Sequence, residues 1–194
     1  MGLFKKKPKK TAQEWFNVGL DFDMQGKTEE AVKCFDRALR TNPNHFDSWS
    51  SKGVALDKLG KFREAIECYD KALEINPNHF ISWFNKGCVL AFLEDYQKAI
   101  ECYDKALEIN PNHLGSLINR GGVLLSLGKY QEAVACFDDA TSIDSNNPGI
   151  WHNKGFALGN LGKHQEEIEC HTMALSIIVN SKKAELARQV KGGK

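Results

Sequence analysis

The sequence AIECYDKALEINPNH occupies residues 65–79 and occurs again, without a change, at residues 99–113. The two copies begin 34 residues apart, and the same interval relates other residues along the chain. Tryptophan lies on this grid at Trp15, Trp49, Trp83 and Trp151, and Leu117 fills the remaining node. A glycine follows each of the five nodes by four residues. Such a period is typical of repeat proteins, in which each repeat is one supersecondary unit, so we expect five repeats.

Each repeat has the spacing of two helices. In the second repeat Trp49, Gly53 and Leu56 follow the i, i+4, i+7 pattern of one helical face. A second pattern of the same kind begins at Phe62. Glycine at Gly60 and the proline-containing loop of residues 76–79 interrupt the two patterns. The sequence therefore predicts an antiparallel helical hairpin in each repeat.

The pattern resembles the tetratricopeptide repeat, and the resemblance covers residues 12–181. In the second repeat it is carried by Trp49, Gly53, Gly60, Phe62, Ala65, Tyr69, Ala72 and Pro77. The resemblance implies an all-α, right-handed superhelix (solenoid) of five hairpins whose first helices line a concave groove. It also implies a role in binding peptide segments of other proteins, and no catalysis.

We expect three regions along the chain. Residues 1–11 form a basic tail, the repeats occupy 12–45, 46–79, 80–113, 114–147 and 148–181, and residues 182–194 form a short capping helix and tail. Several residues depart from the pattern: Glu94 replaces the turn glycine, Ser145 replaces the proline, and Glu167 and His171 replace the alanine and the aromatic residue of the fifth repeat. Terminal repeats are commonly atypical, because one of their faces must remain soluble.

The near-neutral net charge of +1 conceals an uneven distribution. Residues 11–181 contain 16 Lys and Arg against 24 Asp and Glu, whereas the first ten residues contain five Lys and no acid. No apolar run is long enough for a membrane span or for a secretory signal. We therefore expect a cytoplasmic protein.

The cysteines and histidines favour structural roles. Five cysteines lie on the grid at Cys34, Cys68, Cys102, Cys136 and Cys170, one in each second helix. Packed helices lie about 8–10 Å apart, which is too far for a disulfide. His45, His79 and His113 end successive loops, where capping or simple exposure is the favoured role. No metal site, cofactor site, small-molecule site or catalytic nucleophile is predicted.

The predicted groove carries a row of amides. The residues two after each node are Asn17, Ser51, Asn85, Asn119 and Asn153. An amide both donates and accepts hydrogen bonds, so a row of them can pair with the backbone of an extended peptide. The alternative is that asparagine at this position only solvates the helix surface.

The remaining groove positions predict a preference for certain side chains. Toward the N-terminus they form a carboxylate-rich mouth of Phe16, Asp23, Asp47, Ser50 and Asp57. Later positions give an apolar floor that includes Ile81, Phe84, Cys88 and Phe92. An extended or short helical peptide with basic residues toward one end and apolar residues toward the other would suit both.

One activity of the family is disfavoured. The clamp that holds the carboxylate tail of heat-shock chaperones has lysines one residue after a node and two residues before another. Here those positions carry Phe16, Ser50, Phe84, Ile118 and His152, and Gln13, Asp47, Ile81, Gly115 and Gly149. Two charge-assisted contacts to a terminal carboxylate would therefore be missing.

The basic tail permits several interpretations. Its lysines are Lys5, Lys6, Lys7, Lys9 and Lys10. They resemble a nuclear import signal, they could contact nucleic acid or an anionic membrane, or they could be a solvated tail. Two alternatives to peptide binding thus stay open: a charge-driven adaptor tethered by its basic ends, and a module that associates with itself through the fifth repeat.

Overall fold

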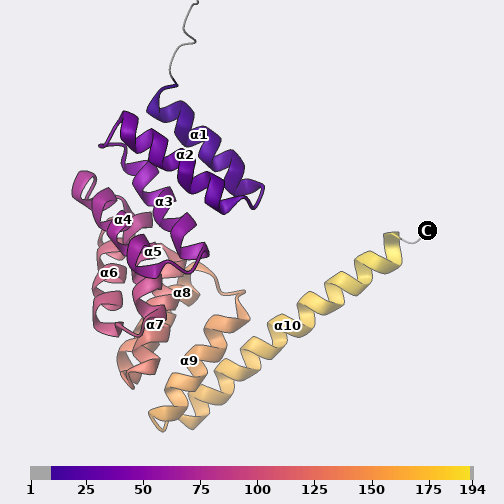
Figure 1. Ribbon diagram of the computed structural model, residues 1–194. Coiled ribbons are helices and arrows are strands. Elements are labelled where there is room, and N and C mark those ends of the chain that lie inside the picture. The colour runs from indigo at the N-terminus through magenta and orange to yellow at the C-terminus, as the bar shows by residue number, and fades with distance from the viewer. Residues whose placement is uncertain (1–9, 193–194) are drawn as a thin grey trace, which may run out of the picture. The chain divides into compact units, whose positions relative to one another are not determined.

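The computed structural model of the protein describes residues 10–192 and, at residues 186, 187 and 190–192, the backbone alone. Ten helices and no strand occur in this part of the chain, so the predicted all-α class is confirmed (Figure 1). None of these helices has the length and apolar character needed to cross a bilayer. The helices are α1 Ala12–Met24, α2 Thr28–Thr41, α3 Phe46–Lys58, α4 Phe62–Ile75, α5 Phe80–Phe92, α6 Tyr96–Ile109, α7 Leu114–Ser126, α8 Tyr130–Ile143, α9 Pro148–Asn160 and α10 His164–Gly192.

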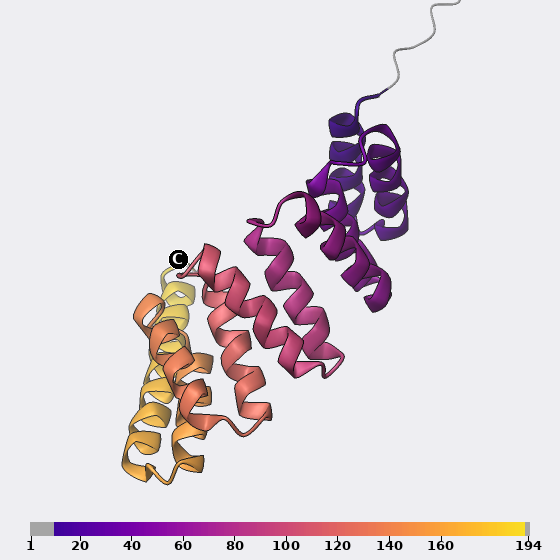
Figure 2. The same cartoon turned by 90° about the vertical axis from the view of Figure 1, so that its left-hand side faces the viewer.

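The chain divides into two compact units at the turn between α5 and α6. Unit 1, Met1–Leu93, contains the paired helices α1 and α2, the paired helices α3 and α4, and then α5. Unit 2, Glu94–Lys194, contains α6, the pair α7 and α8, and the pair α9 and α10. Figure 2 shows the neighbouring helices of each unit lying side by side. Within each unit the second helix of a hairpin also packs on the first helix of the next, which is the stacking expected of a repeat protein.

The tight turns inside the hairpins require a left-handed backbone. Gly26, Gly60, Gly128 and Gly162 have φ between 70° and 74°. Glu94 takes the same position in the third repeat with φ 61°, and it is the one non-glycine residue with a positive φ in the described chain. Glu94 therefore forms the same turn as the glycines do, but its backbone conformation is less favourable than that of a glycine.

Loop histidines cap two of the first helices. His45 Nδ1 accepts a hydrogen bond of 3.2 Å from the backbone N–H of Ser48, and His113 Nδ1 accepts one of 3.2 Å from Ser116. The capping role predicted for these two histidines is confirmed. Thr11 and Glu14 form a reciprocal capping box at the start of α1.

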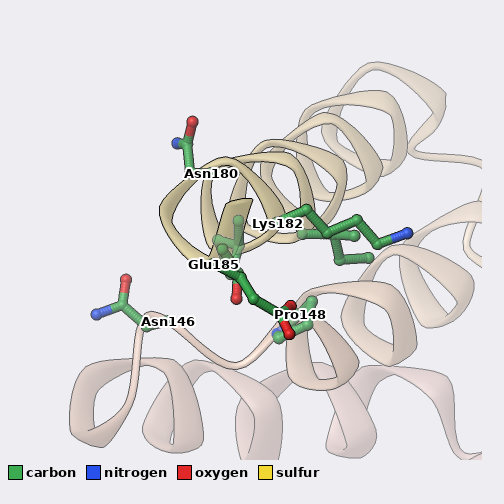
Figure 3. Close-up of a pocket in the computed structure, with 8 residues that line it drawn as sticks. Asn146, Pro148, Asn180, Lys182 and Glu185 are labelled. Atoms are coloured by element: carbon green, nitrogen blue, oxygen red, sulfur yellow. The ribbon is translucent and has the colours of Figure 1, made fainter. Parts of the chain in front are cut away.

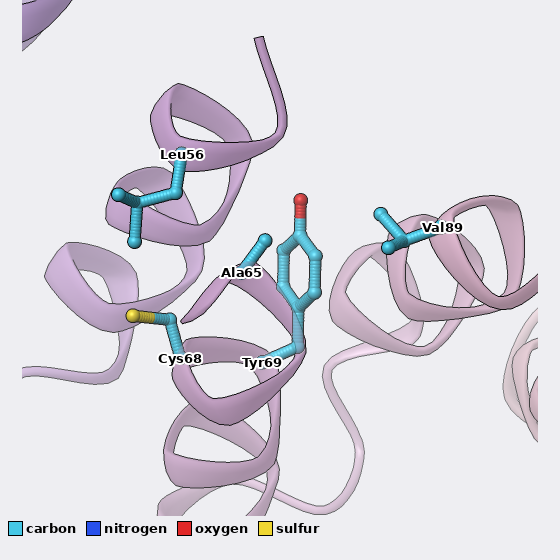
Figure 4. Close-up of a cluster of buried hydrophobic side chains, with 5 residues drawn as sticks. All are labelled: Leu56, Ala65, Cys68, Tyr69 and Val89. Atoms are coloured by element: carbon cyan, nitrogen blue, oxygen red, sulfur yellow. The ribbon is translucent and has the colours of Figure 1, made fainter. Parts of the chain in front are cut away.

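The core of the hairpins within each unit includes a close contact between a glycine and an aromatic ring. In unit 1, Tyr69 is fully buried together with Leu56, Ala65, Cys68 and Val89 (Figure 4). A Cβ atom added to Gly53 would lie 2.6 Å from Tyr69 Cε1, and one added to Gly19 would lie 2.5 Å from Phe35 Cε1. The repeated glycine is thus required by helix packing.

Ion pairs at one repeated position link successive hairpins. Lys52 Nζ lies 2.8 Å from Asp36 Oδ1, and Lys154 Nζ lies 2.6 Å from Asp138 Oδ1. The lysines also lie over the tryptophan rings three residues earlier, with 5.6 Å between Lys52 Nζ and the centroid of Trp49. Lys86 with Asp70, and Arg120 with Asp104, repeat the ion pair.

The C-terminal helix differs from the expected short capping helix. Residues 182–192 continue α10, which has 29 residues, without a break after residue 181. The physical reason is that neither glycine nor proline occurs from His164 to Lys191, so nothing in the sequence stops the helix. The capping segment is therefore the second half of the last hairpin's own helix.

Candidate peptide-binding face

The first helices of unit 1 are α1, α3 and α5, and each contacts the next. We call the surface that carries Asn17, Ser51 and Asn85 on these helices the first-helix face of unit 1. Asn17 is exposed, and Ser51 and Asn85 are half-buried. Asn17 Oδ1 accepts a hydrogen bond of 3.0 Å from Gln13 Nε2. The side chain of Asn85 has no hydrogen-bond partner within the described chain. The side chains of Ser51 and Asn85 are thus partly accessible, and neither makes a hydrogen bond within the described chain.

In unit 2 the corresponding residues lie on α7 and α9, which also contact each other. Asn119 and Asn153 are half-buried there. Phe156 on α9 is 51% exposed. Unit 2 therefore carries two amides and an exposed aromatic residue on its first helices.

The expected carboxylate-rich mouth is only partly negative. Lys58 Nζ donates hydrogen bonds of 2.9 Å and 2.7 Å to the two carboxylate oxygens of Asp23, so this charge is compensated. Desolvation by burial raises the pKa of Asp57 above its usual value. Asp47 is half-buried on α3. Lys58 lies nine residues after the node Trp49, as Phe92 does after Trp83, so the sequence could have placed Lys58 on this face as well.

Two residues predicted for the mouth are committed to internal packing. Ser50 is 5% exposed, which removes it from the surface. Phe16 is half-buried, and its ring centroid lies 5.9 Å from that of Phe35 and 5.2 Å from that of His45. The sequence pattern places both on the first helices, but the neighbouring helices cover Ser50 and much of Phe16.

The predicted apolar floor of unit 1 divides into covered and exposed residues. Phe84 and Cys88 are half-buried, whereas Ile81 is 44% and Phe92 is 68% exposed. The Phe92 ring packs against Phe62 with 4.6 Å between centroids. Met24 lies nine residues after the node Trp15, as Phe92 does after Trp83, and it is 79% exposed. Met24 is therefore a further exposed apolar residue of this face, which was not predicted from the sequence. Large apolar side chains thus flank the polar row at both ends of the face.

Burial affects the chemistry of the cysteines on the repeat grid. None of the six, all of which lie in the described chain, forms a disulfide, and the five on the repeat grid are buried. Desolvation by burial raises the pKa of Cys68 to about 11 and raises the pKa values of Cys34, Cys136 and Cys170 as well. A thiol with a raised pKa carries little thiolate at neutral pH, so these positions favour packing over reactivity.

The predicted electrostatic tail lies mostly outside the described residues, which include Lys10 but not Lys5, Lys6, Lys7 or Lys9. Lys10 Nζ lies 4.7 Å from the centroid of the Trp15 ring. This lysine therefore makes a cation–π contact with the first repeat.

Solved structures with the same fold are numerous. A crystal structure of MamA protein is 20% identical, with a TM-score of 0.82 over 90% of this chain and 94% of that one. MamA residues 41 to the end from Desulfovibrio magneticus RS-1 are 21% identical, with a TM-score of 0.81 over 87% and 96%. YrrB, described as a TPR protein with an unusual peptide-binding site, is 21% identical, with a TM-score of 0.77 over 92% of each chain. At these identities the likeness concerns the fold.

No curated protein matches the sequence. Sequence models of the tetratricopeptide repeat match residues 12–45, 46–79 and 80–113, and others match residues 102–135 and 121–162. Together these matches run without a gap from residue 12 to residue 162. The hairpins, the glycine–aromatic contacts and these matches agree, and the chain belongs to the tetratricopeptide repeat family.

Proposed function

We propose that this protein is a non-enzymatic interaction scaffold that holds an extended peptide segment of a partner protein across the first-helix face of unit 1. The observation that carries the proposal is the accessible amide of Asn85, which has no partner within the described chain and lies on the same helix as the exposed Ile81 and Phe92. Membership of a family that binds protein segments supports it, and YrrB, with the same fold, is described as having a peptide-binding site.

The chemistry of the face suits a peptide backbone. An extended peptide presents N–H and C=O groups that need partners, and an amide side chain offers a donor and an acceptor together. Ser51 and Asn17 offer further polar groups on the neighbouring helices. The exposed side chains of Ile81 and Phe92 would gain about 25 cal/mol for each Å² that a partner removes from water. We therefore expect a ligand with an apolar anchor beside its paired backbone.

The charges on the face favour a basic residue elsewhere in the ligand. Asp47 and Asp57 remain without an ion pair in the described chain, whereas Asp23 is paired with Lys58. The raised pKa of Asp57 reflects its incomplete solvation, which a nearby cation would offset. A lysine or arginine of the ligand that lies near α3 would supply this cation.

Selection from a phage-displayed library of random peptides of about 12 residues tests the proposal. The affinity of the selected peptides is measured by fluorescence anisotropy for the wild type, Asn85→Ala and Asn78→Ala. Asn78 is an exposed loop residue of the same unit and serves as the matched control. We expect Asn85→Ala to weaken binding about tenfold, the loss of one to two hydrogen bonds, and Asn78→Ala to leave it unchanged.

Circular dichroism establishes that each variant is folded. Equal affinities for Asn85→Ala and the wild type would refute peptide pairing on this face, and so would the failure to select any peptide. Binding that disappears at high salt and requires Lys5 to Lys10 would instead favour the charge-driven adaptor.

A further inference from the structure

The last hairpin leaves uncovered a face that the earlier hairpins bury. Leu39 on α2 and Leu73 on α4 occupy one position of the second helix and are 7% and 6% exposed. Leu175 occupies the same position on α10 and is 62% exposed. Within unit 2, Val134 on α8 is 8% exposed, whereas its counterpart Ile168 on α10 is 59% exposed. The next hairpin supplies the cover in the earlier repeats, so α10 presents an apolar face without its usual neighbour.

The helix α10 is longer than its partner α9. At 1.5 Å per residue its 29 residues span about 43 Å, whereas the 13 residues of α9 span about 20 Å. Figure 1 shows α10 continuing past α9. Where the two helices separate, Pro148, Ile178 and Glu185 border an open pocket of about 620 Å³ (Figure 3). The C-terminal part of α10 therefore extends past the N-terminal end of α9 (Figure 1).

The exposed apolar residues of α10 form a seam. Ile168, Leu175 and Val179 are separated by seven and four residues, which is the spacing of a coiled-coil contact. Val179 is 46% exposed, and Ile178 beside it is 39% exposed. A seam of this kind fits a single helix lying lengthwise on α10.

The charges of α10 identify which helix would fit. Its first turns carry Glu166, Glu167 and Glu169, and its second half carries Lys182, Lys183 and Arg188 against one acid, Glu185. A parallel copy would bring like charges together. An antiparallel copy would place each acidic half beside a basic half, so the helix is complementary to itself in that direction alone.

We propose that two copies of this protein associate through antiparallel pairing of their α10 helices. With the two-fold axis near residue 177, Leu175 meets Val179 of the second copy, and the two Ile178 side chains meet each other. Glu169 then lies near Lys183 of the second copy. The contact is isologous, because both copies use the same surface. It therefore gives a closed dimer and no longer polymer.

Sedimentation equilibrium of the full chain measures this association. We expect twice the monomer mass for the wild type, and an increase of more than about 100-fold in the dimer dissociation constant for Leu175→Glu, which places a charge in the seam of both copies. Leu175 is exposed in the single chain, so this variant should fold. Met24→Glu, which changes an exposed apolar residue on α1, is the matched control and should dimerise as the wild type does.

Charge reversal tests the direction of pairing. Glu169→Lys and Lys183→Glu should each weaken the dimer at low salt, and the double variant should restore it, because each residue faces the other across the axis. Within one helix these residues are about 21 Å apart and cannot compensate each other. A monomer at all concentrations, a dimer unaffected by Leu175→Glu, or a double variant weaker than both single variants would each overturn the proposal.

Discussion

The hydroxyl of Ser82 donates a hydrogen bond of 2.9 Å to the hydroxyl of Ser50, and both serines are buried. Ser82 Oγ also lies 2.8 Å from His79 Nδ1. A hydroxyl has one proton to give, so His79 Nδ1 must be the donor in this second hydrogen bond. His45 and His113 differ, because their Nδ1 atoms accept from the backbone at the start of the next helix. A single serine on α3 thus sets the protonated nitrogen of the histidine at the start of α5.

Burial of two loop histidines predicts that stability depends on pH. Desolvation lowers the pKa values of His79 and His113 below the usual 6.5, and Asp47 partly opposes this at His79. The unfolded chain therefore binds more protons than the folded chain when the pH falls below about 6.5. The two neutral histidines therefore make their full contribution to the free energy of unfolding above that pH. The contribution is lost as the pH falls through the pKa values that they have in the folded protein. Urea unfolding from about pH 7.5 to about pH 5 should show this decrease.

The matched variant for the pH effect replaces both histidines by asparagine. Asn147 occupies the equivalent position before α9 and caps it by accepting a hydrogen bond of 3.0 Å from Gly149 N–H, so asparagine at this position can cap the helix that follows. His79→Asn with His113→Asn should remove most of the decrease in stability over this range. An unchanged pH dependence in the double variant would show that other groups are responsible.

The close contact between Gly53 and Tyr69 predicts a large penalty for one added methyl group. In Gly53→Ala the new Cβ would lie 2.6 Å from the ring, so the two helices must separate, at a cost of about 1–3 kcal/mol in the free energy of unfolding. Gly122→Ala is the matched control, because it lies in α7 with nothing within 4 Å of the added Cβ. We expect that change to stabilise the protein by up to about 1 kcal/mol, from helix propensity. Equal effects of the two substitutions in urea unfolding would contradict the packing explanation.

The turn at Glu94 predicts a stabilising substitution. A non-glycine residue at φ 61° costs about 1 kcal/mol relative to glycine, and four other hairpins use glycine at this position. Glu94→Gly should therefore raise the free energy of unfolding by about 0.5–1 kcal/mol. Glu94→Ala separates the backbone effect from that of the charge, and it should not stabilise the protein. Thermal unfolding that ranks alanine above glycine would refute this explanation.

The 34-residue period was enough to predict the class of fold, because the glycine, aromatic and turn positions each have a packing or backbone reason that is local to the repeat. The accessibility of the candidate site was harder to predict. Ser50 and Phe16 share the spacing of surface residues, but Ser50 is covered by the next repeat, where Ser82 bonds to it, and the ring of Phe16 packs on Phe35 and on His45 in the loop before α3. Asp23 is compensated by Lys58 for the same reason. The spacing within a repeat predicts the helix face on which a residue lies. Whether that residue is accessible and unpaired depends on side chains that pack against it from elsewhere in the fold.

The buried serine pair predicts a change of histidine tautomer. In Ser50→Ala the Ser82 hydroxyl loses its acceptor and can donate to His79 Nδ1 instead, which moves the imidazole proton to Nε2 and leaves Nδ1 free to accept, as it does in His45 and His113. Because the hydroxyl finds this second acceptor, the loss of stability should be modest, about 1 kcal/mol. Nitrogen-15 NMR of the imidazole distinguishes the two tautomers, and Ser51→Ala, on the adjacent and half-buried serine, serves as the control. A proton that stays on Nδ1 in Ser50→Ala would show that Ser50 does not set the tautomer of His79.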